Sequence, residues 1–343
     1  MRVPRARLDH LWQRGRAFLG TDLAIMGGAM SWVSERHLVS AISNAGGFGV
    51  LACGSMSPAQ LAEEIKATQK LTAKPFGVNL ITMHPDLEAL IDVVGSLGVG
   101  HVVLAGGLPQ AASIERLKGQ KARVICFAPT VLFAKKLIRM GADALVIEGT
   151  EAGGHIGPVS TSVLAQEILP AINEVPVFVA GGIGRGEVIV SYLQLGAAGA
   201  QLGTRFVCAT ESVAHPRFKQ SFIRAHARDA VPTVQVDASF PVIPVRALAN
   251  RATQRFVDFQ HEVIGRFRRG EIEQKAAQLE IEHYWAGALR RAVVEGDIEN
   301  GSLMAGQSVG MVTREQSTSE ILAELLGQAE QALASASFAM VDA

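Results

Sequence analysis

The feature that most constrains this chain is a regular alternation of short apolar segments with segments of helical periodicity. Eight strand-like segments begin 21 to 31 residues apart, and amphipathic segments lie between them. Near-continuous apolar runs that alternate with helices are typical of a parallel sheet covered on both faces, so the pattern predicts an α/β protein. Eight consecutive units favour a (β/α)8 TIM barrel, with a doubly wound open sheet as the alternative. The strand-like segments are 23–26, 48–52, 76–80, 101–105, 123–127, 144–148, 175–180 and 200–204, and the helical ones are 34–45, 58–70, 86–96, 109–118, 130–140, 161–174 and 185–196.

The alternation stops after residue 210. Residues 211–299 carry charged helical stretches without regular strands, and residues 315–336 read as a closing amphipathic helix. We therefore expect a barrel built from residues 1–210 and 300–343, with 211–299 as a mostly helical insertion after the eighth strand. A lid or substrate-binding subdomain over the barrel mouth is the favoured role for the insertion, and a contact between subunits is the alternative.

Composition narrows the class of partner. Lys plus Arg and Asp plus Glu both number 32, so the formal charge is zero and gives no support to binding of nucleic acid or an anionic membrane. No apolar stretch approaches the roughly 20 residues that span a bilayer. The basic N-terminal segment predicts a leading helix rather than a signal peptide. Three cysteines, far apart and without metal-type spacing, are typical of a reduced cytoplasmic protein.

Glycine-rich turns follow the seventh and eighth strand-like segments. The sequence AGGIGRGE occupies residues 180–187, and GT ends the eighth segment. The loops after strands 7 and 8 of a barrel are the usual phosphate site, and backbone N–H groups at a helix N-terminus attract anions. The alternative is that the glycines only make tight turns between strand and helix. The predicted phosphate clamp consists of Gly181, Gly182, Gly203 and Thr204.

The segment EGTEAGGHIGP, residues 148–158, places a histidine among glycines directly after the sixth strand-like segment. An imidazole titrates near neutral pH and can accept or donate a proton. We predict that His155 is an acid–base group at the barrel mouth, with the glycines leaving room for a flat ligand. Glu148 and Glu151 could orient the ligand or the base. The alternative is a polar residue in a surface loop.

Two further loops on the same predicted face carry candidate contacts. GGAMSWV, residues 27–33, brings small residues together with Met30 and Trp32. Asn79 lies near the end of the third strand-like segment, where a carboxamide can read donors and acceptors on a heterocycle; capping of a helix is the alternative. Metal-ligand spacing, a Gly-x-Ser-x-Gly elbow and a Walker loop are all missing from the sequence. These residues suggest metal-free chemistry on a phosphate-bearing ligand, without distinguishing a flavin from other phosphorylated ligands.

A series of motifs occurs in order from about residue 18 to 330: GGAMSWV, NAGGFGVL, KPFGVNL, GADALVIEGTEAGGHIGP, VFVAGGIGRG, AQLGTRFV, ESVAHPRFK and GSLMAGQSVG. In these motifs the chain resembles the nitronate monooxygenase (2-nitropropane dioxygenase-like) family, which includes the FMN-dependent enoyl-acyl-carrier-protein reductase II. The resemblance implies a barrel that binds FMN beneath a helical subdomain, with His155 as the catalytic histidine. The residues implied to contact the cofactor are Met26, Gly27, Gly28, Met30, Asn79, Glu148, Gly153, Gly154, Gly181, Gly182, Ile183, Gln201, Gly203, Thr204, Met304, Gly306 and Gln307.

The chain also departs from the family pattern. Ala24 stands where the family usually has Pro, and Gly27 where it usually has Gln, which removes one expected hydrogen bond to the flavin. Ala29 replaces a frequent Gly or Pro. Some nitronate monooxygenases carry a basic residue after the fifth strand, but the segment here is CFAPT, residues 126–130. That segment is closer to the reductase-like branch.

The resemblance implies an FMN-dependent oxidoreductase, with oxidation of alkyl nitronates or nitroalkanes by O2 as the leading hypothesis. The second is reduction of enoyl thioesters or quinones with NAD(P)H as co-substrate, because the GTEAGGHIGP and LMAGQSVG segments resemble reductase II. Basic segments at 217–228 and 266–271 are candidate contacts for an acyl carrier protein, or solvated helix faces. A phosphate-ligand-binding barrel without turnover is the third. The physiological substrate, the nicotinamide preference and the oligomeric state, a homodimer included, stay open.

Overall fold

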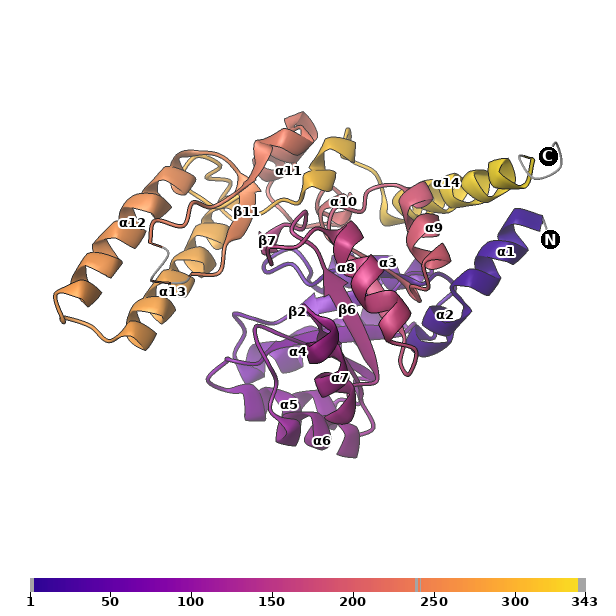
Figure 1. Ribbon diagram of the computed structural model, residues 1–343, viewed down its shortest axis with the longest axis horizontal. Coiled ribbons are helices and arrows are strands. Elements are labelled where there is room, and N and C mark those ends of the chain that lie inside the picture. The colour runs from indigo at the N-terminus through magenta and orange to yellow at the C-terminus, as the bar shows by residue number, and fades with distance from the viewer. Residues whose placement is uncertain (1–2, 238–239, 241, 339–343) are drawn as a thin grey trace.

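The computed structural model describes residues 3–237, 240 and 242–338 and shows the expected (β/α)8 barrel (Figure 1). Parallel pairing runs in the order β1-β9-β8-β6-β5-β4-β3-β2. The ends of this order meet because the Gly27 N–H donates to the Phe48 carbonyl at 2.8 Å and the Phe48 N–H donates to the Ile25 carbonyl at 2.9 Å. The barrel strands are β1 (Ile25–Gly27), β2 (Gly49–Ala52), β3 (Phe76–Ile81), β4 (His101–Ala105), β5 (Arg123–Phe127), β6 (Ala144–Glu148), β8 (Val177–Ala180) and β9 (Gly199–Leu202).

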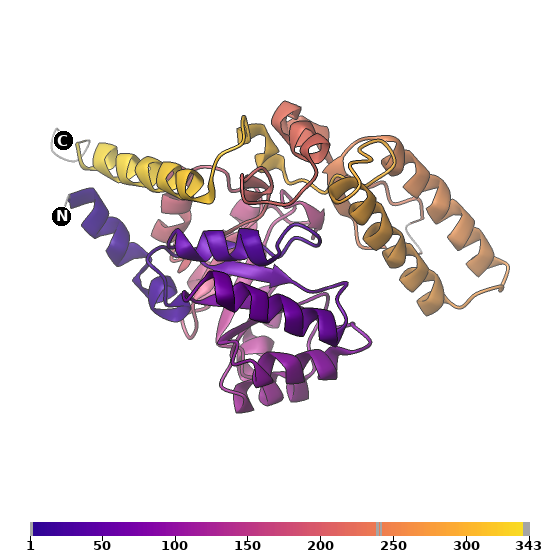
Figure 2. The same cartoon turned by 180° about the vertical axis from the view of Figure 1, so that it is seen from behind.

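Helices cover the outside of the barrel as the periodicity predicts (Figures 1 and 2). Local signals start several of them: Ser57 and Gln60 form a capping box, and the Thr130 side chain accepts a bond from the Phe133 N–H at 3.2 Å. The outer helices are α3 (Arg36–Asn44), α4 (Pro58–Leu71), α5 (Leu87–Ser96), α6 (Ala111–Gly119), α7 (Val131–Arg139), α8 (Thr161–Ile168) and α9 (Gly186–Gln194).

The core has two layers, one between strands and helices and one inside the barrel. Phe18 and Leu19 belong to the inner layer, and the Phe18 carbonyl lies 2.9 Å from the His101 Nε2, at the start of β4, so they lie at the amino-terminal end of the barrel. The leading segment predicted as one helix forms two, α1 (Val3–Leu11) and α2 (Gln13–Leu19), because the backbone leaves helical geometry at Trp12 (φ −103°, ψ 16°). The inner layer also contains Met26, Phe48, Val50, Val103, Ile125, Ala144, Val146, Phe178 and Ala180.

Several predicted boundaries differ from the structure. The helix predicted over 161–174 ends at Ile168 and continues as a 3-10 turn, Leu169–Ala171, that contains Pro170, which has no N–H to continue α-helical bonding. The strand predicted over 200–204 ends at Leu202, because Gly203 is already the N-cap of the short helix α10 (Thr204–Val207). The strand predicted over 23–26 lies at Ile25–Gly27, and the closing helix α14 (Thr318–Phe338) begins later than residue 315.

The insertion contains α11 (Pro216–Arg224), the 3-10 turn η2 (Ala227–Asp229), β10 (Ala230–Pro232), β11 (Val245–Leu248), α12 (Arg251–Arg268) and α13 (Gln274–Val293). Helices α12 and α13 form a hairpin that extends to one side of the barrel, with its own aromatic-rich core (Figure 1). The sequence pattern did not indicate β10 and β11. These two strands form a three-stranded antiparallel sheet, β10-β11-β7, whose third strand is β7 (Gly154–His155) from the barrel loop.

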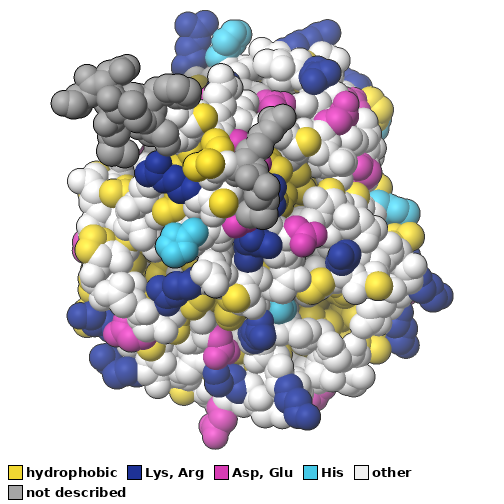
Figure 3. Space-filling model, turned by 90° about the vertical axis from the view of Figure 1, so that its right-hand side faces the viewer, with side chains coloured by type: hydrophobic (Ala, Val, Ile, Leu, Met, Phe, Trp, Pro, Cys, Tyr) yellow, Lys and Arg dark blue, Asp and Glu magenta, His cyan; other side chains and the backbone are white. Residues whose placement is uncertain are grey.

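The first and last described helices lie near each other, because α14 packs beside α1 and α9 (Figure 1). On the face seen in Figure 3, basic and acidic side chains are interspersed. Among the described residues, no helix combines the length and the apolar character needed to cross a membrane.

Candidate active site

Three polar side chains from different strands face the inside of the barrel at its carboxyl end. Residues paired directly across neighbouring strands project from the same face of a sheet. Glu148 pairs with Ala180, Ala180 pairs with Gln201, and Asn79 pairs with Val103. Ala180 and Val103 belong to the inner core layer, so all three polar residues face inward. They form a polar layer at the barrel mouth, above an apolar interior.

Two members of this layer have defined hydrogen-bonding properties. The Asn79 amide donates to the Val103 carbonyl at 3.1 Å, which fixes its orientation across the β3–β4 pair. Burial raises the pKa of the Glu148 carboxyl to about 7. Near neutral pH this group therefore exists in both forms, and it can donate a proton to a ligand acceptor or accept one.

The two glycines after β8 need their lack of a side chain. Gly181 and Gly182 have φ values of 96° and 71°, in the left-handed region. A Cβ on Gly181 would lie 3.0 Å from the backbone of Gly149, and a Cβ on Gly182 would lie 2.8 Å from the Glu151 Cβ. The β8–α9 loop can pass beside the β6–β7 loop only with glycine at both positions.

The second half of the predicted clamp lies at the next strand end. A Cβ on Gly203 would lie 3.5 Å from the Met30 sulfur, and the Gly28 N–H donates to the last carbonyl of β9 at 2.8 Å. The Thr204 hydroxyl accepts a bond from the Gly306 N–H at 3.0 Å. A Cβ on Gly306 would lie 2.8 Å from the carbonyl oxygen of Glu151, the residue that Gly182 also approaches, so the β9 turn connects to the β8 loop through these two residues.

Three other predicted contacts are less available to a ligand. Met26 lies in the inner core layer and Ile183 in the outer one, both with side chains buried in the protein. A Cβ on Gly27 would lie 2.7 Å from the Ile42 Cδ1 on α3. Gly27 therefore faces the helix layer and has no space for the larger residue usual in the resembling family.

His155 takes its backbone position from the insertion. It lies opposite Val245 in the β7–β11 pair, and Gly154 lies opposite Arg246. The adjacent Ile156 N–H donates to the Pro244 carbonyl at 3.0 Å. The His155 side chain is exposed, so a ligand can reach it.

The segment after the insertion lies directly on the histidine loop. A Cβ on Gly153 would lie 2.5 Å from the Gly306 nitrogen, and the Gln307 N–H donates to the Glu151 carbonyl at 2.9 Å. Met304 forms a bridge with Ala247 of β11. The predicted return of residues 304–307 to the loop is therefore present in the backbone, and Gln307 begins the 3-10 turn η3 (Gln307–Met311).

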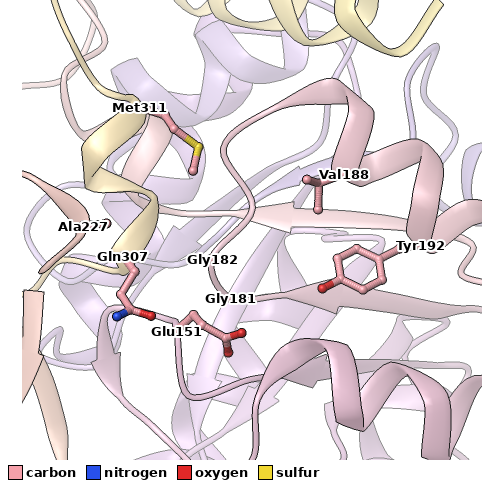
Figure 4. Close-up of a pocket in the computed structure, with 8 residues that line it drawn as sticks. All are labelled: Glu151, Gly181, Gly182, Val188, Tyr192, Ala227, Gln307 and Met311. Carbon is pink, nitrogen blue, oxygen red and sulfur yellow. The ribbon is translucent and has the colours of Figure 1, made fainter. Parts of the chain in front are cut away.

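Glu151, in the β6–β7 loop, lines a pocket of about 290 Å³ together with the β8–α9 loop. Its carboxylate accepts bonds from the Thr161 N–H at 2.8 Å and the Thr161 hydroxyl at 2.9 Å, at the start of α8. The Tyr192 hydroxyl points toward the same side of the pocket (Figure 4), and burial together with the Glu151 charge raises the Tyr192 pKa. The pocket is lined by Glu151, Gly181, Gly182, Val188, Tyr192, Ala227, Gln307 and Met311.

Sequence reasoning missed some of these residues. Tyr192 lies on α9 without any pattern that marks it. Arg246 had a detectable signal, because it is a single cation within the apolar run VIPVRALA, and such a residue is typically a buried guanidinium with defined acceptors. It is 6% exposed. In the described part of the chain, no group of three or more His, Cys, Asp or Glu could hold a metal ion.

Comparison with known proteins agrees with the fold and with the resemblance seen in the sequence. The family model of nitronate monooxygenase matches residues 14–94 and 88–328. A 5-hydroxy-7a-methyl-1-oxo-octahydro-1H-indene-4-carboxyl-CoA dehydrogenase of Mycobacterium tuberculosis is 30% identical over 335 residues, which cover 90% of this chain and 93% of that protein.

Two solved structures extend the likeness. FabK from Thermotoga maritima superposes with a TM-score of 0.83 at 34% identity and covers 94% of this chain and 97% of its own. Nitroalkane oxidase from Streptomyces ansochromogenes superposes with a TM-score of 0.75 at 27% identity and covers 92% of this chain and 98% of its own.

Proposed function

Because this chain belongs to the nitronate monooxygenase family and is an oxidoreductase, we propose that it oxidises alkyl nitronates or nitroalkanes with FMN and O2. The observation that carries the proposal is the position of His155. It is exposed on a glycine loop at the carboxyl end of the barrel strands, where active sites of this fold lie.

The residues at the mouth fit a flavin nucleotide. The glycine turns after β8 and β9 offer backbone N–H groups for a phosphate, in the usual phosphate position of a barrel. The Glu151 carboxylate disfavours an anion inside its own pocket, so we place the phosphate toward Gly203 and Thr204. Asn79, Glu148 and Gln201 offer an amide, a carboxyl and a second amide to a flat heterocycle.

In this proposal the protein positions the substrate and handles its proton. His155 removes the acidic α-proton of a nitroalkane, or donates a hydrogen bond to a nitronate oxygen. Glu148, with its pKa of about 7, can hold or release a proton at the barrel mouth, where it would contact a bound cofactor. Bound FMN supplies the electron transfer from substrate to O2. The polar layer at the mouth orients the cofactor, and the apolar interior below it excludes water.

A second candidate is an oxidoreductase of acyl thioesters that uses NAD(P)H. The observation in its favour is that the carboxyl-CoA dehydrogenase, whose name indicates a CoA thioester, is 30% identical to this chain, against 27% for the nitroalkane oxidase. Here His155 would lie beside the α-carbon of a thioester, where a negative charge also develops next to an electron-withdrawing group.

Anaerobic mixing separates the two candidates. FMN-loaded protein is mixed with propyl-2-nitronate, with NADH or NADPH alone, and with NADH followed by crotonyl-CoA, while the visible flavin absorbance is followed. Loss of absorbance with the nitronate, and slow or no loss with the nicotinamides, is expected. Rapid reduction by NADH and reoxidation by crotonyl-CoA would overturn the first candidate and establish the second. Protein that binds no FMN would contradict both.

A further inference from the structure

Arg246 is a buried cation at the joint between the insertion and the barrel. Its Nε donates to the Thr150 carbonyl at 2.8 Å, and its Nη1 donates to the Ala230 carbonyl at 2.6 Å. Thr150 lies in the loop between β6 and β7, and Ala230 begins β10. One guanidinium therefore bridges the histidine loop and the insertion.

The backbone of Arg246 joins two more segments. The residue lies opposite Gly154 of β7, next to the pair of Val245 with His155. Its carbonyl accepts a bond from the Ala305 N–H at 3.3 Å, in the segment that returns over the loop. The histidine strand, β10, the β6–β7 loop and the returning segment thus meet at a single residue.

A buried guanidinium is an unusual choice for a position that only needs to be filled. Two backbone carbonyls accept the hydrogen bonds of the Arg246 guanidinium. Burial lowers its pKa, and the more distant charge of Glu151 opposes that effect. Burying a guanidinium is costly, whereas an apolar side chain fills space without that cost. The planar fork of donors, which holds two segments at a fixed angle, is what an apolar residue lacks.

We infer that Arg246 is a positioning residue that keeps the His155 strand in register with the insertion. The insertion then delivers the imidazole as well as flanking the mouth, and a movement of β11 away from the barrel withdraws His155 with it. An effect of Arg246 on catalysis rests on the proposed role of His155. Its effect on the position of the His155 strand does not.

The mechanical part is tested by hydrogen exchange of the backbone amides, which needs neither substrate nor activity. Full-length flavin-loaded protein is compared as wild type, Arg246→Met and Arg246→Lys. Arg266→Met is the matched control, because Arg266 pairs with Glu280 at 2.7 Å within the helical hairpin. We expect residues 150–156 to exchange at least about tenfold faster in Arg246→Met, to be intermediate in Arg246→Lys, and to be unchanged in the control. Unchanged exchange of this segment in Arg246→Met would overturn the inference.

The catalytic part is tested by kcat, KM and a double mutant. We expect Arg246→Met to lower kcat by about 10-fold to 100-fold with a smaller change in KM, because displaced catalytic groups lose rate rather than binding. Arg246→Lys should recover part of kcat. In a protein that already carries His155→Ala, Arg246→Met should lower kcat only slightly further, because both changes remove the same function. A lower melting temperature with normal kcat, or fully additive losses, would make Arg246 a folding residue only. If His155→Ala alone had no effect, the proposed function would fail while the exchange result kept its meaning.

Discussion

His155 and Val245 lie opposite each other in an antiparallel pair that joins the sixth βα loop of the barrel to the insertion. The two residues are 90 positions apart in the chain, and β7 has no partner in the barrel sheet. The position of the candidate acid–base group therefore depends on two parts of the fold. Strand β6 fixes where its loop begins, and pairing with β11 fixes its backbone.

Gly182→Ala should destabilise the protein and weaken flavin retention. The position combines a left-handed backbone with a Cβ site 2.8 Å from the Glu151 Cβ. Gly98→Ala is the matched control, because Gly98 has φ 65° with nothing within 4 Å of the Cβ site. Both substitutions should lower the free energy of unfolding by about 1 kcal/mol, because alanine is strained at a positive φ. Gly182→Ala should lower it by about 1–3 kcal/mol more, because its Cβ is overpacked against Glu151. Urea unfolding measures the difference. Equal losses would show that the loop contact is unimportant.

Glu151→Ala should loosen the start of α8. The carboxylate accepts two bonds from Thr161, and its removal leaves the buried Thr161 hydroxyl and N–H without that acceptor. We expect a loss of about 2 kcal/mol in the free energy of unfolding and a lower FMN content after dialysis. Glu167→Ala, on the exposed face of the same helix, should change neither quantity. Wild-type stability in Glu151→Ala would refute the bonding role.

Glu148→Gln should remove a pH dependence of stability. The native carboxyl has a pKa of about 7 against an ordinary value of 4.5, so the folded state binds more protons between these values. Stability of the flavin-free wild type should therefore fall as pH rises through this window. Glu148→Gln should be equal to wild type below pH 4.5 and more stable above pH 7 by about 1–3 kcal/mol. Denaturation midpoints across pH measure this. A difference that does not vary with pH would contradict the raised pKa.

The barrel was predictable because its strands are buried on both faces and are therefore apolar throughout. The segments at 101–105, 123–127 and 144–148 match β4, β5 and β6 at both ends. Gly181, Gly182, Gly203 and Thr204 could be grouped from sequence, since a parallel barrel places all strand ends on one face. Strands β7, β10 and β11 could not be found, because they lie outside the regular strand–helix repeat that identified the equally short β1, β2, β8 and β9. In addition, β7 pairs with β11, which is about 90 residues away in the chain. For the same reason the partners of Arg246 appear only in the fold.

The reaction of His155→Ala with a nitroalkane tests the central claim most directly. Flavin-loaded wild type and variant are mixed anaerobically with nitroethane and, separately, with its preformed nitronate, and the loss of flavin absorbance is timed. If His155 takes the α-proton, the variant should keep its FMN and react about 10²-fold to 10⁴-fold more slowly than wild type with nitroethane. With the nitronate, which has already lost that proton, the variant should be slowed much less. Equal rates for wild type and variant with nitroethane, at equal FMN content, would show that the histidine is not the base.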